Sequence, residues 1–135
     1  MTEIKKINKE DTWIIRHRVL WPDRDLDYIK LEDDERGFHY GFFIQDKLVS
    51  VISLFIEKDS AQFRKFATLH GEQGKGYGSK LLMYTIEEAK RLGVNRIWCN
   101  ARIDKADYYK KFGFSTKGDQ LEKGGQKYYI MEKTL

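Results

Sequence analysis

Three glycines at alternate positions, Gly74, Gly76 and Gly78, separate a strand-like run from a long amphipathic helix. Residues 61–69 have the alternation of a β-strand, whereas apolar residues recur at spacings of three and four over residues 79–92. Glycine lets a backbone approach a ligand closely, and the first turn of a helix has about four N–H groups without partners. This order of strand, glycine loop and helix predicts an α/β chain with an anion site, suited to phosphate or pyrophosphate, at the start of the helix.

The spacing of these glycines differs from two familiar phosphate-binding motifs. It is not the dinucleotide fingerprint Gly-x-Gly-x-x-Gly, and no Gly-Lys-Ser/Thr follows a four-residue gap as in a P-loop. An ordinary flexible connection with a glycine at a tight turn is the alternative interpretation. Gln73 in front of the loop and the helix behind it favour a ligand site, and Lys75 and Lys80 add positive charge nearby.

Composition excludes several classes of protein. With 8 Phe, 8 Tyr and 3 Trp among 135 residues, the chain is too aromatic for long disorder, and its length suits a single domain over residues 1–135. The net charge of +4 comes from lysines and arginines scattered among acids, which argues against a nucleic-acid partner. One cysteine permits no internal disulfide and no cysteine-rich zinc site, so we expect no metal. No apolar stretch reaches the roughly 20 residues of a membrane span, which predicts a soluble, cytoplasmic protein.

Periodicity predicts the order strand, helix, loop, three strands, helix, strand, short helix and two strands. A weak edge strand around Ile4 and Ile7 precedes a helix over residues 13–21, which ends before Pro22. The polar and acidic residues 23–37 are interpreted as a loop with room for one helical turn. The other strands are expected at residues 39–44, 48–56, 61–69, 96–103 and 127–133, and the other helices at residues 79–92 and 104–113.

Periodicity also assigns side chains to the core. Strict alternation in the third of the consecutive strands places Phe63 and Ala67 on one face. Trp13 and Trp21 lie on the apolar stripe of the first helix and are expected in the core. Cys99 alternates with apolar residues, which predicts a buried and chemically inert thiol.

Two segments together carry a resemblance to a known family. Gln73-x-x-Gly76-x-Gly78 matches the Gln/Arg-x-x-Gly-x-Gly/Ala signature of the GNAT superfamily of N-acetyltransferases. Residues 106–114 resemble the family segment that ends in Phe-Tyr-x-Lys-x-Gly-Phe, with Tyr108 in place of the phenylalanine. The resemblance implies an α/β (α+β) fold, with a twisted, mixed and mostly antiparallel sheet and helices on both faces.

The same resemblance implies a binding mode for acetyl-CoA. The backbone of Phe66, Ala67 and Thr68 would pair with the pantetheine arm of CoA. Asn100 would lie near the pantetheine or the reacting centre, and Tyr109 corresponds to the tyrosine that the family often uses as general acid. The backbone amides that would hold the pyrophosphate are those of Gln73, Gly74, Lys75, Gly76, Tyr77, Gly78 and Ser79.

The chemistry of thioester aminolysis agrees with this role for Tyr109. When an amine attacks the thioester, CoA leaves as a thiolate, and a phenol with a pKa of about 10 is protonated at pH 7 and can donate. A strand N–H group, such as that of Thr68, would stabilise the oxyanion. A purely packing role for Tyr109 is the alternative.

The resemblance therefore implies an N-acetyltransferase that moves the acetyl group directly to a primary amine in a ternary complex. The acceptor would be a small molecule or a peptide, and a homodimer is compatible with the family. A non-catalytic module that binds or senses acyl-CoA is the alternative function.

Several polar residues remain candidates for a secondary role. His39, His70 and Glu57 are candidate bases, while His17 on the helix stripe is interpreted as a satisfied, half-buried histidine. Residues 32–35 (Glu-Asp-Asp-Glu) are interpreted as a solvated acidic loop, the alternative being attraction of a cationic amine.

Overall fold

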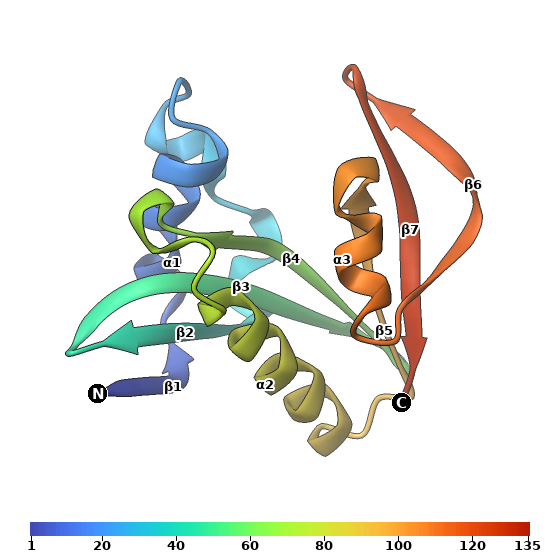
Figure 1. The fold of residues 1–135 in the computed structure, drawn as a ribbon, viewed down its shortest axis with the longest axis horizontal. Coiled ribbons are helices and arrows are strands. Elements are labelled where there is room, and N and C mark those ends of the chain that lie inside the picture. The colour runs from blue at the N-terminus through green and yellow to red at the C-terminus, as the bar shows by residue number, and fades with distance from the viewer.

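The computed structural model describes residues 1–135 as one seven-stranded sheet with helices on both faces (Figure 1). The strands lie in the order β1-β2-β3-β4-β5-β7-β6 across the sheet. All neighbouring pairs are antiparallel except β4 and β5, which run parallel. The mixed, mostly antiparallel sheet implied by the sequence is thereby confirmed.

The order of elements also agrees with the prediction. The strands are β1 (Thr2–Ile7), β2 (Phe38–Ile44), β3 (Lys47–Glu57), β4 (Ser60–Thr68), β5 (Arg96–Arg102), β6 (Ser115–Lys123) and β7 (Gln126–Thr134). The helices are α1 (Lys9–Ile15), α2 (Tyr77–Arg91) and α3 (Ala106–Lys110), with short π- or 3-10 segments at η1 (Arg16–Leu20), η2 (Leu26–Ile29), η3 (Glu32–Arg36), η4 (His70–Glu72) and η5 (Ile103–Lys105). None of these helices has both the length and the apolar character needed to cross a membrane.

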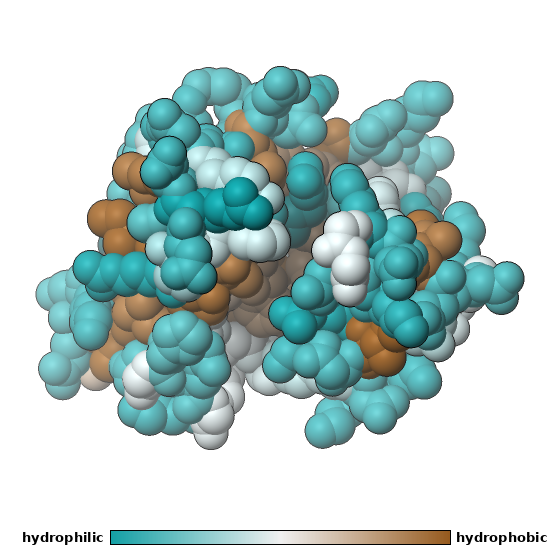
Figure 2. Space-filling model, turned by 90° about the horizontal axis from the view of Figure 1, so that it is seen from above, coloured by the Kyte–Doolittle hydropathy of each residue, from teal (hydrophilic) through white to brown (hydrophobic).

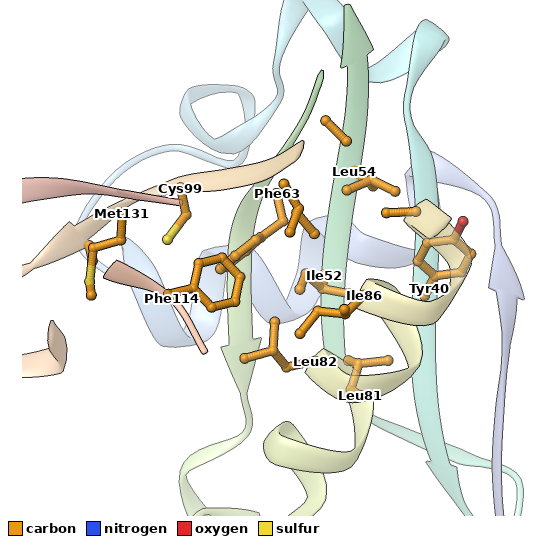
Figure 3. Close-up of a cluster of buried hydrophobic side chains, with 14 of the residues drawn as sticks. Tyr40, Ile52, Leu54, Phe63, Leu81, Leu82, Ile86, Cys99, Phe114 and Met131 are labelled. Atoms are coloured by element: carbon orange, nitrogen blue, oxygen red, sulfur yellow. The ribbon is translucent and has the colours of Figure 1, made fainter. Parts of the chain in front are cut away.

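The larger core lies between the sheet and helices α2 and α3. Leu82 and Ile86 on the apolar stripe of α2 face Ile52 of β3, and the cluster continues through Phe63 to Phe114 after α3 (Figure 3). Leu82 and Ile52 are fully buried. Burial of one such aliphatic side chain contributes about 1.5–3 kcal/mol, so this layer fixes the position of α2 on the sheet.

A β-bulge in β4 changes which side chains share a face. The register with β3 shifts between Val51 and Ser53, and Lys65 at the bulge has a positive φ of 54°. Phe63 consequently packs in the core under α2, whereas Ala67 packs with Ile15 on the opposite face. The prediction that Phe63 and Ala67 share a face was wrong, because one extra residue in a strand reverses the alternation beyond it.

Helix α1 and its π-helical extension η1 cover the other face of the sheet. Asp11 accepts a hydrogen bond from the Asn8 N–H at 3.0 Å, which caps the start of α1. Trp13 is half-buried, and its indole N–H donates to Asp34 at 3.3 Å. Trp21 was wrongly assigned to the core: it lies beyond the end of η1, is 37% exposed and packs edge-on against Tyr28.

Candidate active site

Strands β4 and β5 diverge and leave a wedge between them. They pair only over residues 60–62 and 96–98, although β4 continues to Thr68 and β5 to Arg102 (Figure 1). The bulge at Lys65 lies in this unpaired part of β4, where the extra residue bends the strand. Seen from above, the molecule has a hollow between two halves, with a polar rim and apolar side chains at its floor (Figure 2).

The end of β4 presents backbone groups to this wedge. The Leu69 N–H donates to the Val49 carbonyl at 2.9 Å, and hydrogen-bonded and non-bonded pairs alternate along an antiparallel ladder. Thr68, one residue earlier and opposite Ser50, therefore turns its N–H and carbonyl groups away from β3. Gln73 Nε2 donates to the Thr68 carbonyl at 2.9 Å, so the glycine loop is closed against the strand end and the Thr68 N–H still faces the wedge.

The glycine loop needs its glycines for two different reasons. Gly74 and Gly76 have φ values of 78° and 85°, a left-handed backbone that costs other residues roughly 1–2 kcal/mol. Gly78 instead allows a close approach, because a Cβ there would lie 3.2 Å from Thr68 Oγ1 and 3.3 Å from Phe66 Cζ. The loop is therefore a shaped connection packed on β4, which argues against the interpretation as a merely flexible link.

The start of α2 has the donors that an anion site requires. The first backbone hydrogen bond of the helix runs from the Lys80 N–H to the Gly76 carbonyl at 3.1 Å, so the N–H groups of the preceding turn have no intrahelical partner. Lys75 is held by Glu72, with 2.9 Å between Nζ and Oε1, and this contact raises the pKa of the lysine. The positive end of the helix dipole and the backbone donors, rather than Lys75, thus define this site.

Tyr109 lies at the apex of the wedge. Its ring centroid is 5.6 Å from that of Phe63, the first residue of β4 beyond the paired segment, and 6.0 Å from that of Phe114. Burial raises the pKa of the Tyr109 phenol, with smaller contributions from Cys99 and Tyr108. A phenol held in this way is protonated at every physiological pH and can act only as a proton donor.

A hydrogen bond from Tyr108, the neighbour of Tyr109, links α3 to the first turn of α2. The Tyr108 hydroxyl lies 2.8 Å from Ser79 Oγ, and both side chains are half-buried. Ser79 belongs to the first turn of α2, and Tyr108 precedes Tyr109 on α3. The sequence motifs contain both residues, but no sequence signal indicates that they touch.

Asn100 and Cys99 lie on opposite faces of β5. Cys99 is 2% exposed, which confirms the prediction of a buried thiol, and burial raises its pKa to about 12. Asn100 alternates with the buried Cys99 and Ala101 and is exposed, so it lies on the face of β5 turned away from the core under α2. The structure therefore does not bring Asn100 to the same face as Tyr109.

The candidate bases differ in how available they are. His39 is 4% exposed and both ring nitrogens are hydrogen-bonded, to Ser53 and to the Asp34 carbonyl. His70 is exposed at the start of η4, beside the glycine loop, and Glu57 is exposed at the end of β3. His17 is half-buried and bonded to the Arg24 carbonyl, as predicted. The acidic loop is only partly solvated, because Asp34 is buried.

The diverging strands β4 and β5, the free amides at the start of α2 and the buried Tyr109 phenol together form one candidate site. The sequence profile described as the Acetyltransferase (GNAT) family matches residues 6–114. The chain therefore belongs to the GNAT acetyltransferase family, and acyl transfer is the class of reaction that this membership supports.

Individual relatives agree with this assignment. The "Uncharacterized N-acetyltransferase YitI" of Bacillus subtilis is 34% identical over 145 aligned residues, covering 100% of this chain and 97% of the relative. A solved chain from Lactobacillus plantarum has a TM-score of 0.90 at 18% identity, covering 99% of this chain and 98% of its own. A Bacillus subtilis acetyltransferase in complex with CoA has a TM-score of 0.76 at 21% identity, covering 99% and 97%. The two solved structures support the fold.

Proposed function

We propose that this chain is an acetyl-CoA-dependent N-acetyltransferase that transfers the acetyl group directly to a primary amine. The observation that carries the proposal is the wedge between β4 and β5, which connects the free amides at the start of α2 with Tyr109 at its apex. Acetyl-CoA is an extended molecule with a pyrophosphate near one end and a thioester at the other. Its pyrophosphate needs backbone donors such as the free amides, and its thioester needs a proton donor such as Tyr109.

The residues present fit CoA. The free amides of the first turn of α2 suit its pyrophosphate, and the Thr68 N–H on the open edge of β4 suits an amide of its pantetheine arm. Phe66 and Ala67 precede Thr68 in the part of β4 that pairs with β3 at most and not with β5. Asn100, on the far face of β5, fits a contact with the acceptor side better than one with the pantetheine.

Bound acetyl-CoA would supply an acyl group activated as a thioester. The amine nitrogen forms a bond to the carbonyl carbon, the bond from that carbon to sulfur breaks, and the amine proton passes to solvent. Tyr109 would give its phenol proton to the departing sulfur and take back from solvent the proton that the amine released, since burial favours the neutral phenol. A backbone N–H in the part of β4 that does not pair with β5 would stabilise the developing oxyanion. His39 is excluded as a base because both nitrogens are engaged.

Two measurements test the proposal. Isothermal titration with CoA and with acetyl-CoA is expected to show binding, and no binding at millimolar ligand would contradict it. A screen of amine classes, monitored by release of free thiol from acetyl-CoA, is expected to show turnover with at least one primary amine. Binding of acetyl-CoA without transfer to any amine would contradict the catalytic part.

A non-catalytic acyl-CoA binding module is the second candidate. The observation that favours it is the packing of Tyr109 against Phe63 and Phe114, which a purely structural aromatic would also show. The amine screen separates the two functions, because a binding module binds the thioester and leaves it intact.

A further inference from the structure

Three cations gather where β4 faces α1, beside the point at which β4 separates from β5. Lys65 lies at the bulge and is half-buried, Arg64 precedes it, and Arg16 of η1 is completely buried. Burial lowers the pKa of Lys65, and the charges that act on it are those of Arg64, Arg16 and Asp34. Asp34 is therefore the one carboxylate that acts on Lys65, against the charges of two arginines.

The carboxylate of Asp34 is already saturated. Arg16 donates to both of its oxygens, from Nη1 to Oδ2 at 2.8 Å and from Nη2 to Oδ1 at 2.9 Å. The Trp13 indole N–H and the Leu31 backbone N–H also donate to Oδ2, at 3.3 Å and 3.0 Å. Asp34 therefore balances the charge of Arg16 and leaves that of Lys65 uncompensated.

The neighbouring polar groups supply no further acceptor. The Asp34 carbonyl can only accept, so His39 carries its proton on Nε2 and donates a hydrogen bond from there. Its Nδ1 accepts a hydrogen bond from the Ser53 hydroxyl at 2.7 Å. Ser53 Oγ in turn accepts from Arg16 Nη2 at 2.9 Å. The one buried side-chain polar atom without a partner in the chain is Arg16 Nε, which is a donor. The group thus has an excess of donors and of positive charge.

The nearby acidic loop does not remove this excess. Neither Lys65 nor Arg64 takes part in any ion pair of the chain. Within the acidic loop, Asp33 pairs with Arg36 and Glu35 with Lys9, and neither Glu32 of the loop nor Glu57, which lines a pocket together with Arg64, forms an ion pair with Lys65 or Arg64. A half-buried lysine without a counter-ion is costly unless a ligand supplies one.

We propose that Lys65, supported by Arg64, binds a carboxylate of the amine acceptor, so that the enzyme acetylates amino carboxylates such as free amino acids rather than polyamines. This inference rests on the proposed function. Lys65 belongs to the part of β4 that borders the wedge, on the face opposite α2, and an acceptor bound on that face approaches the thioester from the side away from the pyrophosphate site.

The positive charge around Lys65 favours an acceptor that carries a carboxylate as well as an amine. A cationic site repels an ammonium ion and lowers its pKa, which promotes the deprotonation that the amine needs before it can attack. A substrate carboxylate next to the amine offsets the repulsion by pairing with Lys65. A polyamine carries only the charge that Lys65 repels.

Matched substrates give the test. The specificity constant kcat/KM is measured for amino acids and for the corresponding carboxamides, which differ only in the charge of the carboxyl group. We expect the acids to be preferred by about tenfold or more, as for other charge-assisted hydrogen bonds. In Lys65→Gln this preference is expected to disappear, because activity on the acids falls much more than activity on the amides, while the Kd for CoA stays unchanged.

Lys58→Gln is the matched control, because Lys58 also has a positive φ, 57°, and is exposed in the turn between β3 and β4. It is expected to keep the preference. Should Lys65→Gln fail to fold, Arg64→Gln provides the second variant, with the same expected direction. Equal kcat/KM values for acids and amides in the unaltered enzyme would overturn the inference.

The proposed function and this inference fail in different ways. Transfer to amines without a preference for acids leaves the function intact and rejects the carboxylate site. If no amine is acetylated, the function fails, and titration of N-acetyl amino acids against their amides decides the carboxylate site. Tighter binding of the acids that Lys65→Gln abolishes would support the site, and equal binding would reject it.

Discussion

Ser79 Oγ and the Tyr108 hydroxyl oxygen are 2.8 Å apart, and this hydrogen bond joins the first turn of α2 to α3. The turn that contains Ser79 has the free amides of the proposed pyrophosphate site, and Tyr108 is the neighbour of Tyr109. The two ends of the proposed site are thereby connected by side chains as well as by the sheet. A substitution at Ser79 or Tyr108 is therefore expected to affect both α2 and α3.

Tyr108→Phe is expected to lower the free energy of unfolding by about 1 kcal/mol, because it removes one half-buried hydrogen bond. Ser79→Ala is expected to cost a similar amount, and the double variant no more than either single one. Urea unfolding of the four proteins measures this coupling. Strictly additive costs would show that the bond contributes nothing to stability.

Gly76→Ala is expected to weaken CoA binding by about tenfold or more. A residue with a Cβ resists the φ of 85° that Gly76 adopts, at a cost of roughly 1–2 kcal/mol, and any relaxation turns the amides of the turn away from one another. Isothermal titration measures the Kd. Gly71→Ala is the matched control, since Gly71 has no positive φ and a Cβ there meets no atom within 4 Å. Equal affinities for the two variants would refute the role of the loop shape.

The glycine loop could be predicted from sequence because its backbone conformation requires particular residues. Gly74 and Gly76 adopt positive φ, and Gly78 leaves room for Thr68. The positions of the glycines therefore determine the shape of the loop. The pair Arg16–Asp34 and the pair Ser79–Tyr108 are different, because 18 and 29 residues separate their members. Charged and hydroxyl residues occur all along the chain, and no local pattern selects these partners.

The bulge at Lys65 is the reason why the faces of the side chains in β4 could not be predicted correctly. Alternation identifies a strand, but a single extra residue leaves the composition unchanged and reverses every face after it. Lysine at a positive φ is not a residue that sequence patterns associate with a bulge. The position of Lys65, and with it the cationic group beside the wedge, follows only from the pairing of β4 with β3.

Tyr109→Phe is expected to lower kcat by about 100-fold, which is within the range for removal of a general acid. The Kd for CoA is expected to stay the same, because the phenyl ring retains its packing on Phe63 and Phe114. Steady-state kinetics and titration on the same preparation check both values. A parallel loss of affinity and turnover would instead point to a structural role.

Asp34→Asn is expected to lower the free energy of unfolding by about 3–5 kcal/mol, because it leaves the buried Arg16 without its counter-ion. Burial by itself would raise the pKa of Asp34, but the hydrogen bonds from Arg16 and Leu31 lower it overall. Denaturant unfolding at pH 7 measures the loss. Asp33→Asn is the control, with an expected cost below about 1 kcal/mol, since its pair with Arg36 lies at the surface. Similar costs for the two variants would contradict a special role for the buried pair.

Alkaline pH is expected to destabilise the fold through Cys99 and Tyr40. Burial raises the pKa of the Cys99 thiol from 9.0 to about 12 and that of Tyr40 from 10.0 to about 12. A raised pKa in the folded state means that the unfolded chain loses its protons first, so these two groups leave the free energy of unfolding unchanged well below pH 9 and lower it from there towards pH 12. The expected loss by pH 11 is about 2–4 kcal/mol, at roughly 1.4 kcal/mol for each unit of pKa difference.

Denaturant unfolding at pH 8 and pH 11 measures this loss, and Cys99→Ala separates the contribution of the thiol. Alanine lacks the titrating group, so the variant is less stable at pH 8 because of the cavity it leaves, yet its further loss between pH 8 and pH 11 is expected to be about half that of the unaltered protein or less. Tyr40 and Tyr109, whose phenol pKa values burial also raises, then account for the part that begins near pH 10. An identical pH dependence in the two proteins would mean that the thiol of Cys99 titrates in the folded state as it does in water.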